Sequence, residues 1–229
     1  MRKKLQPFLK EFVYGAVDGS ITTFAVVAGA EGANLSSAVI IILGIANLIA
    51  DGFSMSVGSY LSSRSEKLQY EQFKAREYWE IEHMRASEVQ EVREIFRSKG
   101  FEGTLLEDIV NKITENKEAW VDIMMKHELN MTREDRSSFA IGLATFLSFF
   151  IAGSIPLIVY VYDYFYPTQL SLFLYSAGFT GITFIGIGLL KAVTTQSRKL
   201  KRVLETLLLG TAAAMLAYFT GKLLDLWVL

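Results

Sequence analysis

Four glutamates in the middle of the chain have the spacing of a metal-binding helix face. At 100° per residue, Glu77, Glu80, Glu88 and Glu91 fall within an arc of roughly 80°, and Met84 lies between them. Like charges at this spacing repel one another, and a bound cation would convert that repulsion into affinity. A solvated acidic helix face is the structural alternative, and the stripe alone does not decide between the two.

Three residues further along the chain could close such a site from a second helix. Met124, Met125 and Glu128 are spaced i, i+1 and i+4. Thioether sulfur beside carboxylate oxygen favours a transition metal over Mg²⁺ or Ca²⁺, with little selectivity among Fe²⁺, Mn²⁺, Co²⁺ and Zn²⁺. His83 and His127 fall outside this pattern, and we interpret them as surface residues.

A second set of candidate ligands lies inside apolar segments. Asp18 is accompanied by Gly15 and Gly19, whose four-residue spacing permits close helix approach, and Asp51 and Met55 share one face of the next segment. Ionisable groups at membrane depth are costly, so we interpret Asp18, Asp51 and Met55 as a cation path. The alternative is structural, with the aspartates bonding neighbouring helices and the methionine filling space.

Five apolar runs must position these residues. About 20 residues at 1.5 Å each cross the roughly 30 Å of bilayer hydrocarbon. The sequence therefore predicts an all-α, polytopic membrane protein with five transmembrane helices. They are predicted at residues 12–32, 36–63, 138–161, 169–191 and 204–227.

A polar block separates the second and third spans. Between Arg64 and Arg136 lie 30 of the 47 charged residues, 17 acids and 13 bases. The predicted organisation is transmembrane helices one and two in 1–63, a cytoplasmic helical metal-binding domain in 64–136, and transmembrane helices three to five in 137–229.

The second span enters this block without a helix-stop signal. The first such signals are Lys99-Gly100 and Gly103, so we expect one helix from Ser36 past Glu66 that extends as far as Ser98. Shorter helices at 104–116 and 117–131 would complete the domain.

Basic residues set the expected orientation. Lysines and arginines are concentrated at the N-terminus and in the loop after the fourth span, and the two intervening loops on the other side have none. The N-terminus and residues 64–136 are therefore expected to be cytoplasmic. No organellar presequence is visible, which favours a prokaryotic cytoplasmic membrane, or a vacuolar-type membrane in a eukaryotic host.

Composition excludes several classes of function. The net charge of −1 argues against nucleic-acid binding, and the absence of cysteine excludes disulfides, zinc ribbons, iron–sulfur clusters and a cysteine nucleophile. A ferritin-like di-iron oxidase needs two Glu-x-x-His motifs, and Glu80-x-x-His83 is the only one. We therefore expect no enzyme and no prosthetic group. A metal-sensing membrane protein without transport is the other alternative, and it would not need Asp18.

Two segments resemble the vacuolar iron transporter family, in a form closer to its prokaryotic branches. They are YGAVDGSITTFAVVAG in the first span and ADGFSMSVGSYLSSRSE in the second, and the similarity extends over nearly the whole chain. The resemblance implies a homodimer that exchanges Fe²⁺ for protons along a path between the first helices of the two protomers. We expect export of Fe²⁺ from the cytoplasm, with Mn²⁺ as a second cargo. The resemblance also implies an intramembrane site at Asp18 and Met55 and a cytoplasmic site. The implied cytoplasmic ligands are Glu77, Glu80, Glu88, Glu91, Met124, Met125 and Glu128.

One position departs from that family's pattern. Many members read Gly-Glu-Tyr or Gly-Glu-Phe after the Ser-Met signature, whereas this chain reads Gly58-Ser59-Tyr60. A carboxylate is therefore missing from the implied path, and Asp51, two turns earlier, is the candidate to compensate.

Overall fold

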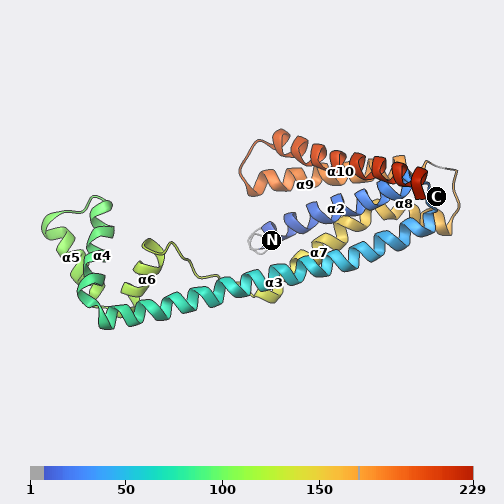
Figure 1. Cartoon of the computed structure of the whole chain (residues 1–229). Coiled ribbons are helices and arrows are strands. Elements are labelled where there is room, and N and C mark those ends of the chain that lie inside the picture. Colours follow the sequence, from blue (N-terminus) through green and yellow to red (C-terminus); the bar gives the residue numbers. More distant parts are fainter. Residues whose placement is uncertain (1–7, 170, 229) are drawn as a thin grey trace. The chain divides into compact units, whose positions relative to one another are not determined.

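The computed structural model describes residues 8–169 and 171–228, and this part of the chain is helical without any strand (Figure 1). The all-α prediction is confirmed. The described chain forms two compact units. We call the chain up to Leu61 and from Arg136 onward the apolar unit, and Ser62–Asp135 the polar unit.

The apolar unit contains the long hydrophobic helices. They are α2 (Leu9–Gly32), the first part of α3 (Ser37–His83), α7 (Ser138–Ser154), α8 (Ile158–Phe165), α9 (Leu172–Thr194) and α10 (Lys199–Val228). A short 3₁₀ turn, η2 (Ile155–Leu157), joins α7 to α8. It contains Pro156, whose missing N–H interrupts the regular ladder of the predicted third span.

Five helical segments in the described residues are long and apolar enough to cross a membrane. They are Leu9–Gly32, Ser37–His83, Ser138–Phe165, Leu172–Thr194 and Lys199–Trp227. Each contains most of one predicted span, so the five-helix prediction is confirmed. The ends differ because a helix does not stop where its apolar run stops: α2 begins at Leu9 and α10 at Lys199, among charged residues.

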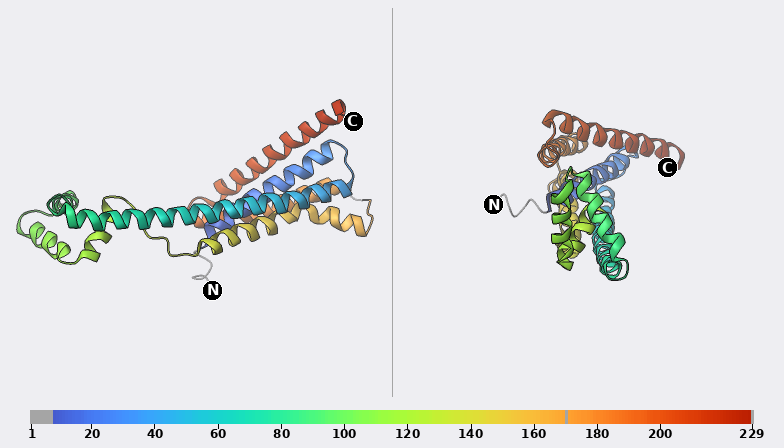
Figure 2. Two further views of the ribbon diagram at one scale, coloured as in Figure 1. Left: turned by 60° about the horizontal axis from the view of Figure 1, so that its bottom comes forward. Right: turned by 90° about the vertical axis from the view of Figure 1, so that its left-hand side faces the viewer.

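Helix α2 lies at the centre of the apolar unit. It runs between α10 and α7 and also contacts α9 (Figures 1 and 2). The approach is very close at Gly19, where an added Cβ would collide with the backbone carbonyl of Phe149 on α7. Gly221 of α10 meets the backbone of Gly29 in the same way. These contacts depend on the absence of a side chain, as expected where small residues let membrane helices pack.

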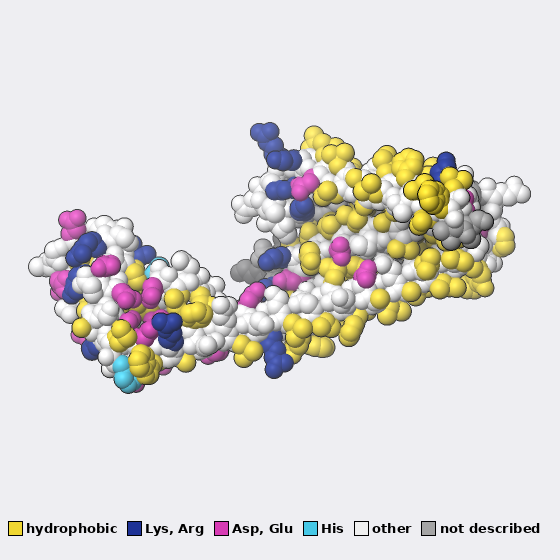
Figure 3. All heavy atoms as spheres, viewed as in Figure 1, with side chains coloured by type: hydrophobic (Ala, Val, Ile, Leu, Met, Phe, Trp, Pro, Cys, Tyr) yellow, Lys and Arg dark blue, Asp and Glu magenta, His cyan; other side chains and the backbone are white. Residues whose placement is uncertain are grey.

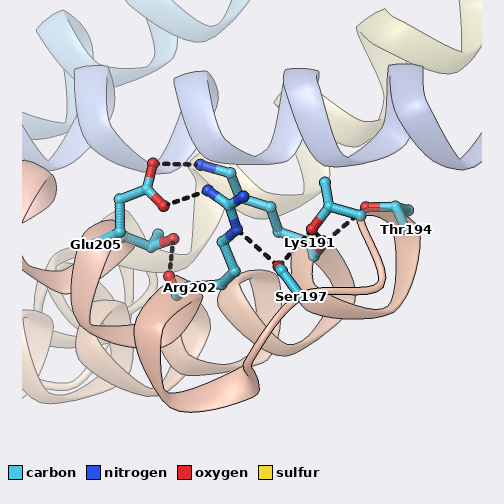
Figure 4. A network of polar contacts seen from close by, with 7 residues as sticks. Lys191, Thr194, Ser197, Arg202 and Glu205 are labelled. Carbon is cyan, nitrogen blue, oxygen red and sulfur yellow. Dashed lines mark hydrogen bonds and ion pairs between the residues drawn. The ribbon is translucent and has the colours of Figure 1, made fainter.

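A polar network fixes the turn between α9 and α10 (Figure 4). Glu205 accepts hydrogen bonds from Lys191 Nζ at 3.1 Å and from Arg202 Nη1 at 2.8 Å. Arg202 Nε also donates to Ser197 Oγ at 2.8 Å. These side chains are partly exposed, so the network contributes little stability and mainly sets the local geometry.

The polar unit consists of the end of α3 with α4 (Arg85–Ser98), α5 (Gly103–Thr114) and α6 (Lys117–His127). Its core surrounds the fully buried Trp120 and includes Ile81 and Val92. Helix α6 begins at Asn116, whose Oδ1 accepts hydrogen bonds from the backbone of Glu118 and Ala119. This N-cap satisfies two amides that the helix itself leaves without partners.

The expectation of one helix as far as Ser98 is wrong beyond His83. Helix α3 is continuous from Ser37 through Glu66 to His83, and Met84, with φ −126° and ψ 32°, begins α4. No proline or glycine causes the break. The bend brings Ile81 of α3 and Val92 of α4 into the core around Trp120.

Candidate metal sites

The break at Met84 arranges acidic side chains around a pocket in the polar unit. Because the helix bends there, the glutamates expected on one helix are divided between α3 and α4 and face a shared space of about 190 Å³. We call this space the acidic pocket. Its lining includes Glu77, Glu80, Glu88, Glu91, Glu128 and Met84. Figure 3 shows acidic side chains gathered on this unit.

Two of these glutamates are almost fully buried and lack partners. Glu77 is 2% exposed and Glu88 is 4% exposed. Within the described chain, Oε2 of each carboxylate is buried and has no hydrogen-bond partner. An unpaired carboxylate away from water costs free energy unless a proton or a cation neutralises it. The pocket is therefore electrostatically incomplete without one or the other.

The pKa values of the buried glutamates are shifted in the direction expected for unneutralised carboxylates. Burial, followed by repulsion from Glu128 and Glu88, raises the pKa of Glu77 from 4.5 to about 7. Burial, followed by repulsion from Glu91 and Glu80, raises the pKa of Glu88 to about 7. Burial also raises the pKa of Glu128. The carboxyls of Glu77 and Glu88 therefore hold protons near neutral pH that a divalent cation would have to displace.

The acidic pocket is not a finished coordination sphere. Among the described residues, no three His, Asp or Glu side chains converge tightly enough to hold a metal ion as they stand. The carboxylates instead line an open pocket, and binding requires them to turn toward a common centre.

The predicted sulfur ligands lie elsewhere. Met124 and Met125 are 0% and 1% exposed and belong to the core around Trp120 rather than to the lining of the acidic pocket. Met84 is the thioether on the lining. Its position among the glutamates in sequence was the signal that could have made it a candidate. The roles predicted for Met124 and Met125 as ligands stay predictions.

The acidic pocket also contains a basic residue, Arg76, that was not among the residues predicted from the sequence. Arg76 lies on its lining, and Arg76 Nε donates to Glu80 Oε1 at 2.9 Å. The i, i+4 spacing of the two residues could have indicated the pair.

In the apolar unit, Asp18 and Asp51 lie on α2 and α3, close enough for their charges to interact. Asp18 is half-buried and Asp51 is exposed. No described residue forms a hydrogen bond or ion pair with either carboxylate. A hydroxyl and an amide lie nearby. Thr22 Oγ1 donates to the backbone oxygen of Asp18 at 2.9 Å, and Asn47 Nδ2 is 3.5 Å from Thr22 Oγ1. Figure 3 shows acidic groups amid the hydrophobic surface of this unit.

Met55 and Ser59 occupy the following turns of α3. Met55 is half-buried and packs against the cluster that contains Leu48 and Phe149. Ser59 Oγ accepts a hydrogen bond from Thr145 Oγ1 of α7 at 3.2 Å. The position where a carboxylate was expected is therefore a link between two helices.

Comparison with known proteins assigns the class. The model of the VIT family matches residues 9–222. The vacuolar iron transporters of Plasmodium berghei and Plasmodium falciparum are 36% and 34% identical over 223 residues, which cover 94% of this chain and 82% of each relative. Vacuolar iron transporter 1 of Arabidopsis thaliana is 31% identical over 222 residues, 95% of this chain and 86% of that protein.

The chain belongs to the VIT family. Its five apolar helices and this membership make it a multi-pass membrane protein. The names of the relatives are those of transporters, so the expectation that the chain is not an enzyme is confirmed.

Proposed function

We propose that this protein moves Fe²⁺ out of the cytoplasm in exchange for protons. The observation that carries the proposal is the pair of buried, unpartnered carboxylate oxygens of Glu77 and Glu88 in the acidic pocket. Iron is the metal in the names of the relatives. Mn²⁺ is a second cargo in this proposal, because carboxylate and thioether ligands discriminate weakly among transition metals.

In the proposed mechanism, the acidic pocket collects the metal and releases protons as it does so. Carboxyls whose pKa lies near 7 hold protons in the metal-free pocket at neutral pH. A carboxylate oxygen cannot hold a proton and a metal ion at the same time, so binding of one expels the other. This competition supports the coupling of iron and proton movement.

Asp18, Asp51 and Met55 form the membrane path in this proposal. Asp51 is exposed on the surface of a single chain, among apolar residues that would face lipid. A charged aspartate facing hydrocarbon costs about 3 kcal/mol. We infer that a second copy covers the two aspartates, which makes the functional form a homodimer with the path between the copies.

The proposal also assigns an orientation. The N-terminus and the polar unit face the cytoplasm, because the lysine- and arginine-rich segments alternate with loops that contain neither lysine nor arginine. The acidic pocket then faces the compartment from which Fe²⁺ is taken.

Proteoliposomes test the proposal directly. Purified protein is reconstituted into vesicles loaded with a metal-quenched dye and a pH indicator, and Fe²⁺ is added without oxygen. We expect Fe²⁺ to enter vesicles with an acidic interior faster than vesicles without a pH gradient, and the interior pH to rise as it enters. Entry that is indifferent to the gradient would reject proton coupling, and absence of entry would reject transport. The same assay with Mn²⁺, Co²⁺ and Zn²⁺ defines the cargo.

A further inference from the structure

We propose that Arg76 is an exchangeable counter-ion of the acidic pocket: it pairs with Glu80 while the pocket holds no metal and leaves when metal binds, which lowers the affinity for the metal. This inference rests on the proposed metal-binding role of the pocket. It assigns Arg76 a part in setting how tightly the pocket holds its ion.

The position of Arg76 is the first support. It is the basic residue among the described residues that line the pocket, which otherwise brings five glutamates together. Its Nε donates to Glu80 Oε1 at 2.9 Å, and Glu77 and Glu128 also attract its charge. The guanidinium thus supplies positive charge where a metal ion would supply it.

Competition for Glu80 is the second support. Glu80 Oε1 accepts the hydrogen bond from Arg76 with one of the lone pairs that a metal ion could use. The Glu80 side chain is 17% exposed, so few water molecules can take the place of either cation. A metal ion that coordinates through the lone pair used by Arg76 displaces the guanidinium, and repulsion between the two cations favours the same outcome.

The pair is built to separate easily. The Arg76 side chain is 66% exposed, so the guanidinium regains water when it leaves Glu80. In an i, i+4 pair on a helix, the order acid then base is the more stabilising one, and here the base comes first. A weakly held competing cation such as Arg76 is useful in a transporter, because the metal ion must bind tightly enough to enter the site and loosely enough to leave it.

Calorimetric titration of the full-length protein with Fe²⁺, without oxygen, tests the inference. Arg76→Gln should bind Fe²⁺ roughly threefold to tenfold more tightly than the wild type, because a competing charge is gone. Arg76→Lys, which keeps the charge, should stay near the wild type. Arg93→Gln is the matched control: Arg93 pairs with Glu107 at 2.7 Å in the same unit, and neither residue lines the acidic pocket. This control should change the affinity less than twofold.

The outcomes separate the two proposals. If the wild type binds Fe²⁺ and Arg76→Gln binds it equally or more weakly, the counter-ion role is overturned. Weaker binding would mean that Arg76 positions Glu80 for the metal. Wild-type protein that does not bind Fe²⁺ would overturn the pocket and this inference together. Helical circular dichroism of each variant verifies that a changed affinity is not a folding defect.

Discussion

The acidic pocket and the aspartate pair of the apolar unit differ in what neutralises their charge. The pocket gathers five glutamates and contains its own base, Arg76. Asp18 and Asp51 have no ion-pair partner among the described residues, and Asp51 is exposed on the single chain. The first site can exist without metal because protons and an arginine balance it. In the proposed homodimer, the second site is covered by the other copy of the chain. This difference predicts different responses to mutation.

The largest expected effect is on transport. We expect Asp18→Asn to reduce Fe²⁺ entry into proteoliposomes to the level of protein-free vesicles, because the path loses its half-buried charge. Fe²⁺ binding by the acidic pocket should be unchanged in calorimetry. Asp225→Asn is the control, since Asp225 of α10 only accepts a hydrogen bond from Asn34 at the surface. Transport by Asp18→Asn at the wild-type rate would remove Asp18 from the path.

The next effect concerns the pocket. The double variant Glu77→Gln, Glu88→Gln should bind Fe²⁺ about tenfold to a hundredfold more weakly, because it loses the two buried charges. Glu94→Gln is the matched control on α4, because Glu94 is exposed and bonds only Gln90. Calorimetry of the three proteins makes the comparison. Unchanged affinity in the double variant would show that the buried carboxylates are not ligands.

A smaller effect is a pH dependence of stability. Folding raises the pKa of Glu77 and Glu88 from 4.5 to about 7, so between these values the folded chain holds protons that the unfolded chain releases. Stability of the metal-free polar unit should therefore fall as pH rises from about 4.5 to 7, on the order of a few kcal/mol in total. Thermal melting at pH 5 and pH 8, followed by tryptophan fluorescence, measures it. Fe²⁺ should raise the melting temperature most at pH 8. Equal melting temperatures at both pH values without metal would contradict the prediction.

The smallest effect distinguishes the methionines. Met84→Leu should reduce the preference for Fe²⁺ over Mg²⁺ a few-fold, because it removes a sulfur from the lining of the acidic pocket. Met124→Leu conserves volume in the core and should change binding less. Competition titrations measure both preferences. A larger loss in Met124→Leu would identify Met124 as the sulfur ligand, as predicted from the sequence.

Much of the fold follows from patterns in the sequence, and the exceptions have physical causes. Apolar runs long enough to cross hydrocarbon predicted all five apolar helices, and Gly19 marked a position of close helix approach, which the structure shows to be between α2 and α7. The break at Met84 was not predictable from local signals, because no proline or glycine marks it.

The candidate sites were predicted less completely. Spacing along the chain selected the glutamates of the acidic pocket, even though they belong to two helices rather than one. It did not reveal Arg76, since a base beside an acidic stripe is usually a surface residue. Nor did it reveal that Ser59 bonds Thr145, because that contact joins residues far apart in the chain.

The backbone contacts of α2 have a consequence for how such a protein could move. Gly19 contacts α7 at the middle of α2, and Gly29 contacts α10 near the C-terminal end of α2, both without intervening side chains. Sliding or rotation of α2 would bring a residue with a side chain against the backbone of the neighbouring helix, where only glycine fits. We therefore expect these three helices to move together as one rigid body.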